Sequence, residues 1–208
     1  MDPLVIGLVG KTASGKGMIA DILEEKIKDL GWSVSRIRFS DSLREFIQEL
    51  KKRGINLAMS KLNLISIAEA GKLSFAPDFL AQSMIRRTKN CRTNVCLWDG
   101  LRWPCEDLLA LRSFADNMLI AVTAEDSVRH KRFINRKEHW EDALVSLADF
   151  KLIDSRDTEK YIVDIIEKAD LVISNEEDDS RYSAPRPMKV LGALELVAGS
   201  VRSRLISR

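Results

Sequence analysis

The chain has 208 residues, with 33 Lys and Arg against 31 Asp and Glu, and 45% of its residues are hydrophobic. This length suits one large domain with its own core, and the formal net charge of +2 excludes the basic excess typical of a dedicated nucleic-acid binder. No apolar run approaches the ~20 residues of a bilayer span, and the N-terminus lacks the basic region of a signal peptide. We therefore expect a cytoplasmic protein that binds neither nucleic acid nor membrane.

Three cysteines, Cys91, Cys96 and Cys105, include no CxxC pair. An odd number without such a pair is a poor disulfide framework and a poor zinc site. The two histidines, His130 and His139, lie in a distant charged segment. We interpret the cysteines as small buried hydrophobic residues.

Short apolar runs alternate with helical patterns along the chain. The predicted strands are residues 4–9, 34–39, 95–98, 118–123 and 171–174. The clearest helical patterns are residues 15–30, 42–54, 77–89 and 188–207. Ser42 and Glu45 form a capping-box pattern at the start of the second helix. This alternation predicts an α/β fold with one five-stranded parallel sheet. Residues 55–92 and 137–155 are interpreted as helical insertions above its C-terminal edge, where such sheets bind ligands.

The last helical pattern, residues 188–207, follows a polar connector, residues 177–187. Its apolar stripe consists of Leu191, Leu194, Val197 or Ala198, Val201 and Leu205. The sequence leaves two interpretations open. The stripe either packs on the sheet or pairs with a second chain in a homodimer.

Residues 10–17 carry the strongest functional signal. They are Gly10, Lys11, Thr12, Ala13, Ser14, Gly15, Lys16 and Gly17, which match the GxxxxGK phosphate-loop pattern with Gly in place of the final Ser or Thr. The motif lies between a predicted strand and an amphipathic helix, which is the context it requires. Backbone N–H groups and the helix N-terminus surround phosphate there, and Lys16 bridges the outer phosphates. We predict that this loop binds ATP with Mg²⁺; a glycine-rich turn without a ligand is the alternative.

On these residues the chain resembles the P-loop kinases of nucleotides and small metabolites. The GKG form is that of adenylate-kinase-type enzymes, which usually continue with a Thr whose hydroxyl lies near Mg²⁺. This chain has Met18 instead. The resemblance therefore implies that magnesium is held through water or by another residue, such as Asp99.

Asp99 ends the third apolar strand, at the position of a Walker-B acid that holds magnesium. Arg102 follows on the next loop and is predicted to contact a phosphate of the substrate. Residues 99–106 read DGxRxPxE, a pattern similar to that of archaeal predicted nucleotide kinases related to dephospho-CoA and deoxynucleotide kinases. The alternative for Asp99 and Gly100 is an ordinary turn.

Asp41 follows the second strand, and Arg44 lies one turn into the next helix. A carboxylate there orients or deprotonates the attacking oxygen, while a guanidinium binds a phosphate in a bidentate manner. The resemblance places the acceptor-binding region at this point. A helix-start acid and a solvated arginine are the alternative.

Arg129, Arg132 and Arg136 are spaced so that they share one helix face. The resemblance implies a lid helix whose arginines stabilise the transferring phosphoryl group, so we expect them to act in the transition state. A solvated basic face is the alternative. Asn175 falls where the family's base-binding loop lies.

The resemblance implies a P-loop kinase domain over residues 1–176, with an acceptor-binding region at about 40–92 and a lid at about 126–157. Residues 177–208 then form the connector and C-terminal helix. The leading function is ATP-dependent phosphoryl transfer to a nucleoside monophosphate, with dephospho-CoA as the alternative acceptor. Another class is an ATP-binding switch or inactive kinase with a protein partner. The missing hydroxyl at Met18 favours it slightly, and the coincidence of Asp41, Asp99, Arg102 and the lid arginines opposes it. A nucleic-acid-dependent ATPase is disfavoured by the near-neutral charge and few aromatic residues.

Overall fold

The computed structural model describes residues 2–135, 145–176 and 188–206. Five strands in this part form one parallel sheet in the order β2-β3-β1-β4-β5. The strands are β1 Leu4–Val9, β2 Val34–Arg38, β3 Val95–Leu101, β4 Asn117–Thr123 and β5 Leu171–Ser174. The five predicted strands and the parallel sheet are confirmed. Strand β3 continues past the predicted end, because Asp99 pairs with Leu8 of β1. Asp99 therefore lies on a strand rather than in a turn.

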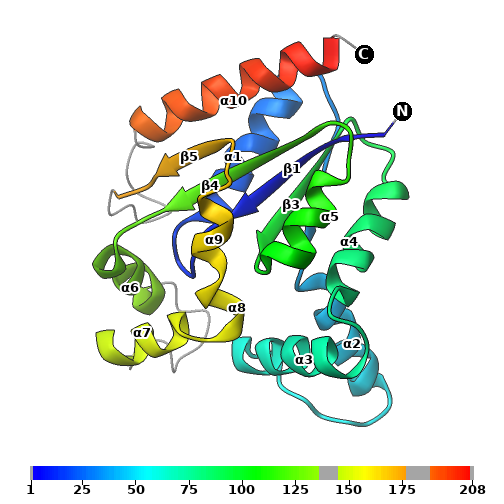
Figure 1. Ribbon diagram of the computed structural model, residues 1–208, viewed down its shortest axis with the longest axis vertical. Coiled ribbons are helices and arrows are strands. Elements are labelled where there is room, and N and C mark those ends of the chain that lie inside the picture. The colour runs from blue at the N-terminus through cyan, green and yellow to red at the C-terminus, as the bar shows by residue number, and fades with distance from the viewer. Residues whose placement is uncertain (1, 136–144, 177–187, 207–208) are drawn as a thin grey trace.

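Helices connect and surround these strands (Figure 1). They are α1 Lys16–Asp29, α2 Asp41–Lys52, α3 Lys61–Ser74, α4 Phe79–Lys89, the π-helix η1 Pro104–Leu108, α5 Leu109–Arg112, α6 Asp126–Asn135, α7 Leu147–Asp154, α8 Asp157–Lys160, α9 Ile162–Ile166 and α10 Met188–Ile206. The capping box predicted at Ser42 is wrong. Helix α2 begins one residue earlier, and the Ser42 hydroxyl lies 2.7 Å from the Ser83 hydroxyl of α4.

The buried strand β1 separates two layers of core. Leu4, Ile6 and Leu8 pack on the side of α1 and α10, whereas Val5 and Val9 pack on the side of α4, α5 and α9. Alternate residues of a strand point to opposite faces of the sheet. A continuously apolar strand therefore requires cover on both faces, as Figure 1 shows.

The C-terminal helix α10 packs against α1 and β5 of the same chain. Val190, Leu194, Val197 and Val201 are buried in this contact. Val190 takes the place that the predicted stripe assigned to Leu191, which is partly exposed. The interpretation that this helix packs on the domain is confirmed. A homodimer stays a prediction.

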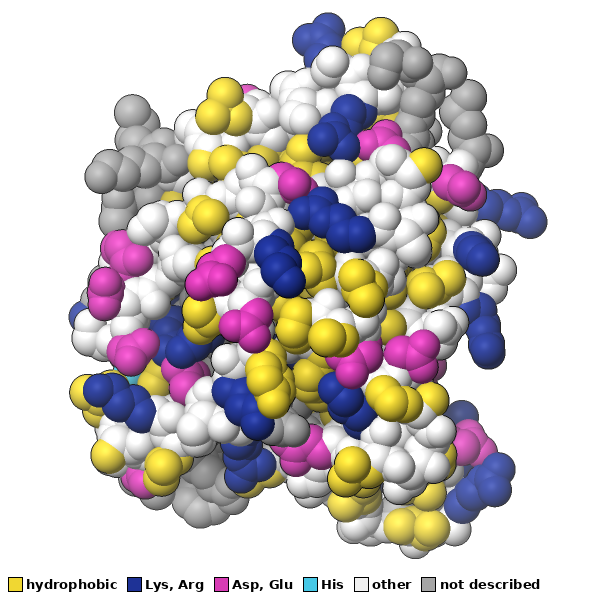
Figure 2. Space-filling view, viewed as in Figure 1, with side chains coloured by type: hydrophobic (Ala, Val, Ile, Leu, Met, Phe, Trp, Pro, Cys, Tyr) yellow, Lys and Arg dark blue, Asp and Glu magenta, His cyan; other side chains and the backbone are white. Residues whose placement is uncertain are grey.

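The three cysteines differ in their exposure to solvent. Cys96 is buried, Cys91 is partly exposed and Cys105 is exposed, so the interpretation as buried hydrophobic residues is wrong for Cys105. Figure 2 shows basic and acidic side chains mixed over one face. Within the described ranges, no helix has the length and apolar composition needed to cross a bilayer.

Candidate functional site

The phosphate loop joins β1 to α1 and contains two positions, Gly10 and Gly15, where a larger residue does not fit. Ala13 and Gly15 have positive φ angles of 61° and 97°. A Cβ atom on Gly10 would lie 2.2 Å from the Val122 carbonyl oxygen, and one on Gly15 would lie 2.1 Å from Asn175 Nδ2. Both glycines are therefore required by close approach of their neighbours. This arrangement matches the loop that the sequence predicts.

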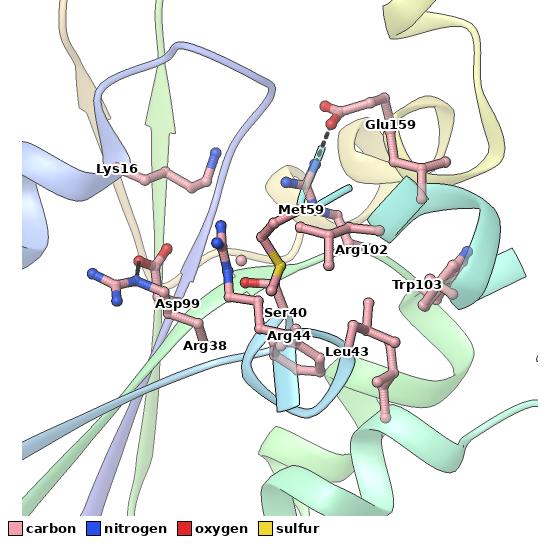
Figure 3. A pocket seen from close by; sticks show the side chains of 16 residues that line it. Lys16, Arg38, Ser40, Leu43, Arg44, Met59, Asp99, Arg102, Trp103 and Glu159 are labelled. Atoms are coloured by element: carbon pink, nitrogen blue, oxygen red, sulfur yellow. Dashed lines mark hydrogen bonds and ion pairs between the residues drawn. The ribbon is translucent and has the colours of Figure 1, made fainter. Parts of the chain in front are cut away.

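Lys16 begins α1 at the mouth of this loop. Its Nζ donates to the carbonyl oxygens of Gly10 and Lys11, at 2.6 and 3.0 Å. The Lys16 side chain also lines a cavity beside the loop (Figure 3). The ammonium group is thus placed between the loop and the cavity, where phosphate oxygens from either side come within its reach.

Arg132 and Asn175 support the last turn of the loop. Asn175 is buried, and its Nδ2 donates to the Ser14 carbonyl at 2.9 Å. Arg132 donates to the same carbonyl at 3.3 Å and to Asn175 Oδ1 at 3.4 Å. Arg132 therefore lies at the loop as predicted. The base-binding role of Asn175 stays a prediction, since the contacts described here hold the loop itself.

Arg129 is buried, with 1% of its surface exposed. It donates to the Thr12 carbonyl at 3.0 Å, to Asp154 Oδ1 at 3.1 Å and to Asp126 at 2.7 Å. Burial lowers the pKa of this guanidinium, but the hydrogen bonds that it donates to Asp154 and Asp126, together with their negative charge, outweigh burial and raise it. These contacts join α6 and α7 to the phosphate loop. Arg129 and Arg132 both donate to carbonyls of the phosphate loop, so they share one helix face as their spacing predicts. The catalytic role of Arg129 stays a prediction, and Arg136 lies outside the described residues.

Glu159 is the main site residue that the sequence analysis missed. Its side chain comes from α8 and is 1% exposed. The carboxylate accepts from the Thr12 N–H at 3.0 Å and from the Thr12 hydroxyl at 2.7 Å, and it also pairs with Arg102. Arg102 thus reaches the loop through Glu159, as the dashed line in Figure 3 shows. No motif surrounds Glu159 in the sequence, so no sequence signal indicated this role.

Asp99 lies beside the loop because β3 is the neighbour of β1. Its Oδ2 accepts from Arg36 Nη2 at 2.6 Å and Nε at 3.1 Å, and Arg38 Nε lies 3.5 Å away. Burial lowers the pKa of Arg36, but pairing with Asp99 and with Asp21 raises it overall. The other oxygen, Oδ1, has no hydrogen bond within the described ranges. A carboxylate oxygen is a ligand that magnesium prefers, so Asp99 fits the predicted metal position.

Asp41 and Arg44 both lie in the first turns of α2, but only Arg44 lines the cavity. Asp41 Oδ2 accepts from the Arg38 N–H at 2.8 Å, and Asp41 is absent from the described lining of the cavity. Its role as the group that activates the acceptor stays a prediction. Arg44 lines the cavity and extends into it (Figure 3). Its guanidinium makes no ion pair or hydrogen bond with any residue that the structure describes.

The cavity has a volume of about 440 Å³ and lies at the C-terminal ends of β1, β2 and β3. This size is in the range of small-molecule sites. Its described lining consists of Lys16, Arg38, Phe39, Ser40, Leu43, Arg44, Met59, Leu64, Ile65, Ala68, Leu80, Asp99, Gly100, Arg102, Trp103 and Glu159. The predicted residues Lys16, Arg44, Asp99 and Arg102 therefore meet in one place.

The loop after β3 is held by the buried carboxyl group of Asp107. Its Oδ2 accepts from the backbone N–H groups of Arg102 and Trp103 at 2.7 and 3.1 Å. Burial raises the pKa of Asp107 to about 7, which outweighs the lowering effect of these two donors. Its Oδ1 is buried without a hydrogen-bond partner among the described residues. The position of Arg102 thus depends on a carboxyl group that titrates near neutral pH.

We expect Asp107→Asn to change how stability depends on pH. The unfolded carboxyl titrates near 3.8, so the folded chain binds the extra proton between these two pKa values. The contribution of Asp107 to stability therefore falls as pH rises through that window. Relative to the wild type, the free energy of unfolding of Asp107→Asn should rise by about 2–3 kcal/mol from pH 5 to pH 8. Urea unfolding of both proteins across this range measures the difference, and parallel curves would contradict the prediction.

Sequence comparisons find distant relatives of this chain. No protein-family model matches the chain. It is 29% identical to a UPF0200 protein of Methanothermobacter thermautotrophicus over 176 aligned residues. The alignment covers 85% of this chain and 83% of that protein. The chain is 28% identical over 180 residues to a UPF0200 protein of Methanoculleus marisnigri, covering 86% and 91%.

Solved structures with a similar fold include small-molecule kinases. Shikimate kinase from Bacteroides thetaiotaomicron superposes with a TM-score of 0.58 at 13% identity, over 96% of this chain and 98% of that chain. A gluconokinase from Sinorhizobium meliloti superposes with a TM-score of 0.52 at 14% identity, over 98% of both chains. The chain therefore has the P-loop kinase fold. These similarities show the fold, and the phosphoryl acceptor has to be inferred from the residues of the site.

Proposed function

We propose that this protein transfers a phosphoryl group from ATP to a nucleoside monophosphate. The observation that carries the proposal is the position of Arg44, which extends into a cavity that Lys16 of the phosphate loop also lines. The Arg44 side chain is exposed and makes no ion pair in the described structure, so its guanidinium is available to bind an anionic group of the substrate. The donor and acceptor phosphates would then meet at Lys16.

In this proposal each charged group has a separate task. Lys16 binds the outer phosphates of ATP, and Arg44 binds the acceptor phosphate. Arg132 donates to the Ser14 carbonyl of the phosphate loop at 3.3 Å, and from this position it would stabilise charge on the transferring phosphoryl group. Asp99 would hold magnesium, which when bound neutralises charge on the phosphate oxygens. Catalysis then consists of positioning and charge stabilisation.

The proposal is tested by measuring ADP formation from ATP and magnesium with each of AMP, GMP, CMP, UMP and dephospho-CoA. We expect ADP to form when a nucleoside monophosphate is present. Arg44→Met should raise the KM for that acceptor strongly while the Kd of ATP stays within about threefold, since Arg44 lies on the acceptor side. If the protein binds ATP but turns over none of these acceptors, the proposal is contradicted and the ATP-binding switch is favoured. Turnover with dephospho-CoA and with none of the nucleoside monophosphates would make dephospho-CoA the acceptor instead.

We expect Asp99→Asn to raise the magnesium requirement. The amide keeps the size of the side chain but loses the charge that attracts the cation, so the magnesium concentration at half-maximal rate should increase about tenfold or more. Binding of ATP in the absence of magnesium should change little. Because Asp99 also pairs with Arg36, Arg36→Met serves as the control for loss of that pair. Equal magnesium titrations in the wild type and Asp99→Asn would leave Asp99 with a structural role.

A further inference from the structure

Glu159 places a buried carboxylate against the phosphate loop. Its Oε2 accepts from the Thr12 N–H at 3.0 Å, and its Oε1 accepts from the Thr12 hydroxyl at 2.7 Å. Glu159 also lines the same cavity as Lys16. A carboxylate has the same sign of charge as the phosphates that this loop is proposed to bind, so the two repel each other. The acid therefore weakens ATP binding unless a cation compensates for its charge.

The cation that compensates for Glu159 is Arg102, in the loop after β3. Glu159 Oε1 accepts from Arg102 Nη1, and the dashed line in Figure 3 marks this pair. The backbone N–H of Arg102 donates to Asp107 at 2.7 Å, so Arg102 is held both at its main chain and at its guanidinium. A guanidinium has five N–H donors in a planar fork. It can therefore pair with Glu159 and bind a phosphate oxygen at the same time.

Resting on the proposed function, we propose that Glu159 is a positioning residue for phosphoryl transfer. It holds the Arg102 guanidinium beside the phosphate loop, where Arg102 contacts the transferring phosphoryl group. Because Glu159 is bound to the backbone of Thr12, the place of Arg102 is set relative to the loop that binds ATP. A cation that is fixed before the reaction stabilises transition-state charge without being reordered at that moment.

Glu159→Gln separates this role from support of the loop. The amide keeps the size of the side chain and an oxygen that accepts from Thr12, but it loses the charge that holds Arg102. We expect kcat with a nucleoside monophosphate to fall about 10²-fold, the scale of a small misplacement. The Kd of ATP, from isothermal titration, should instead decrease about threefold or more, because a negative charge beside the phosphates is gone. A kcat within about threefold of the wild type, or a loss of ATP affinity that matches the loss of kcat, would overturn the inference.

A double-mutant cycle tests whether Glu159 acts through Arg102. Arg102→Met alone should lower kcat by about 10²- to 10³-fold, since it removes one group that stabilises transition-state charge. Adding Glu159→Gln to Arg102→Met should lower kcat by less than about threefold more, because the two residues act as a unit. A further loss of about 10²-fold in the double variant would show that Glu159 acts elsewhere and would overturn the inference.

Asp170→Asn is the matched control. Asp170 accepts from the Leu119 N–H at 2.6 Å and from Arg112 Nη1 at 2.8 Å, so it has the same kinds of partner, and it is absent from the described lining of the cavity. Its loss should leave kcat and the Kd of ATP unchanged.

Glu159→Asp is the second variant if Glu159→Gln is poorly folded. It keeps the charge but shortens the side chain, so kcat should fall while the Kd of ATP stays constant. A wild-type kcat in folded Glu159→Asp would overturn the inference and leave the proposed function intact. If the wild type itself turned over no nucleoside monophosphate, the proposed function and the inference would both be overturned.

Discussion

Replacing Lys16 by Ala is expected to lower kcat by about 10²- to 10³-fold or more, the scale seen when one group that stabilises transition-state charge is removed. Lys16 stands at the start of α1, between the phosphate loop and the cavity. It is the cation that both phosphates of the proposed reaction would share. Charge on the transferring group increases toward the transition state, so the loss should be larger in kcat than in the Kd of ATP.

Lys28→Ala is the matched control for this change. Lys28 lies in the last turn of the same helix and is exposed, so its loss should leave kcat and ATP affinity unchanged. Thermal unfolding of both variants shows whether the loop contacts of Lys16 with Gly10 and Lys11 matter for folding. A Lys16→Ala protein with wild-type turnover and ATP affinity would remove the loop from the proposed mechanism.

The largest loss of stability is expected for Arg129→Met. The change keeps an apolar stem but leaves the Thr12 carbonyl and the Asp154 carboxylate without their buried donor. Breaking a buried ion pair on one side costs about 3–5 kcal/mol. Lys11 Nζ lies 3.5 Å from Asp154 and compensates in part, so we expect a loss of about 3 kcal/mol. For a chain of this size that lowers Tm by about 6–12 °C.

Two comparisons identify the origin of this loss. Arg129→Met combined with Asp154→Asn should recover part of the stability, because the unpaired buried charge is then removed as well. Arg202→Met, on the exposed side of α10, should change the free energy of unfolding by less than about 0.5 kcal/mol. If Arg129→Met lowered the free energy of unfolding in urea no more than Arg202→Met does, the buried contacts of Arg129 would contribute nothing measurable to stability and the prediction would be wrong.

Elements defined by neighbouring residues were predictable from the sequence. The apolar run at β1 and the loop Gly10–Lys16 depend on local periodicity and on spacing within one short segment, and both were found in place. The end of β3 was misjudged, because Asp99-Gly100 has the composition of a turn. Pairing with Leu8 of β1 keeps Asp99 extended instead, and a strand partner this far away in the chain leaves no local signal.

The partners of the charged side chains were decided by tertiary structure alone. Glu159 binds Thr12 across 147 positions of sequence, and Arg36 binds Asp99 across 63. An arginine or a glutamate is compatible with water, with a buried partner and with a ligand, so its type and spacing do not choose among these surroundings. The strand order and the packing of α6–α8 on the phosphate loop make that choice. They bury Arg129 as a structural link and leave Arg44 directed into the cavity, although the sequence showed both only as cations on helices.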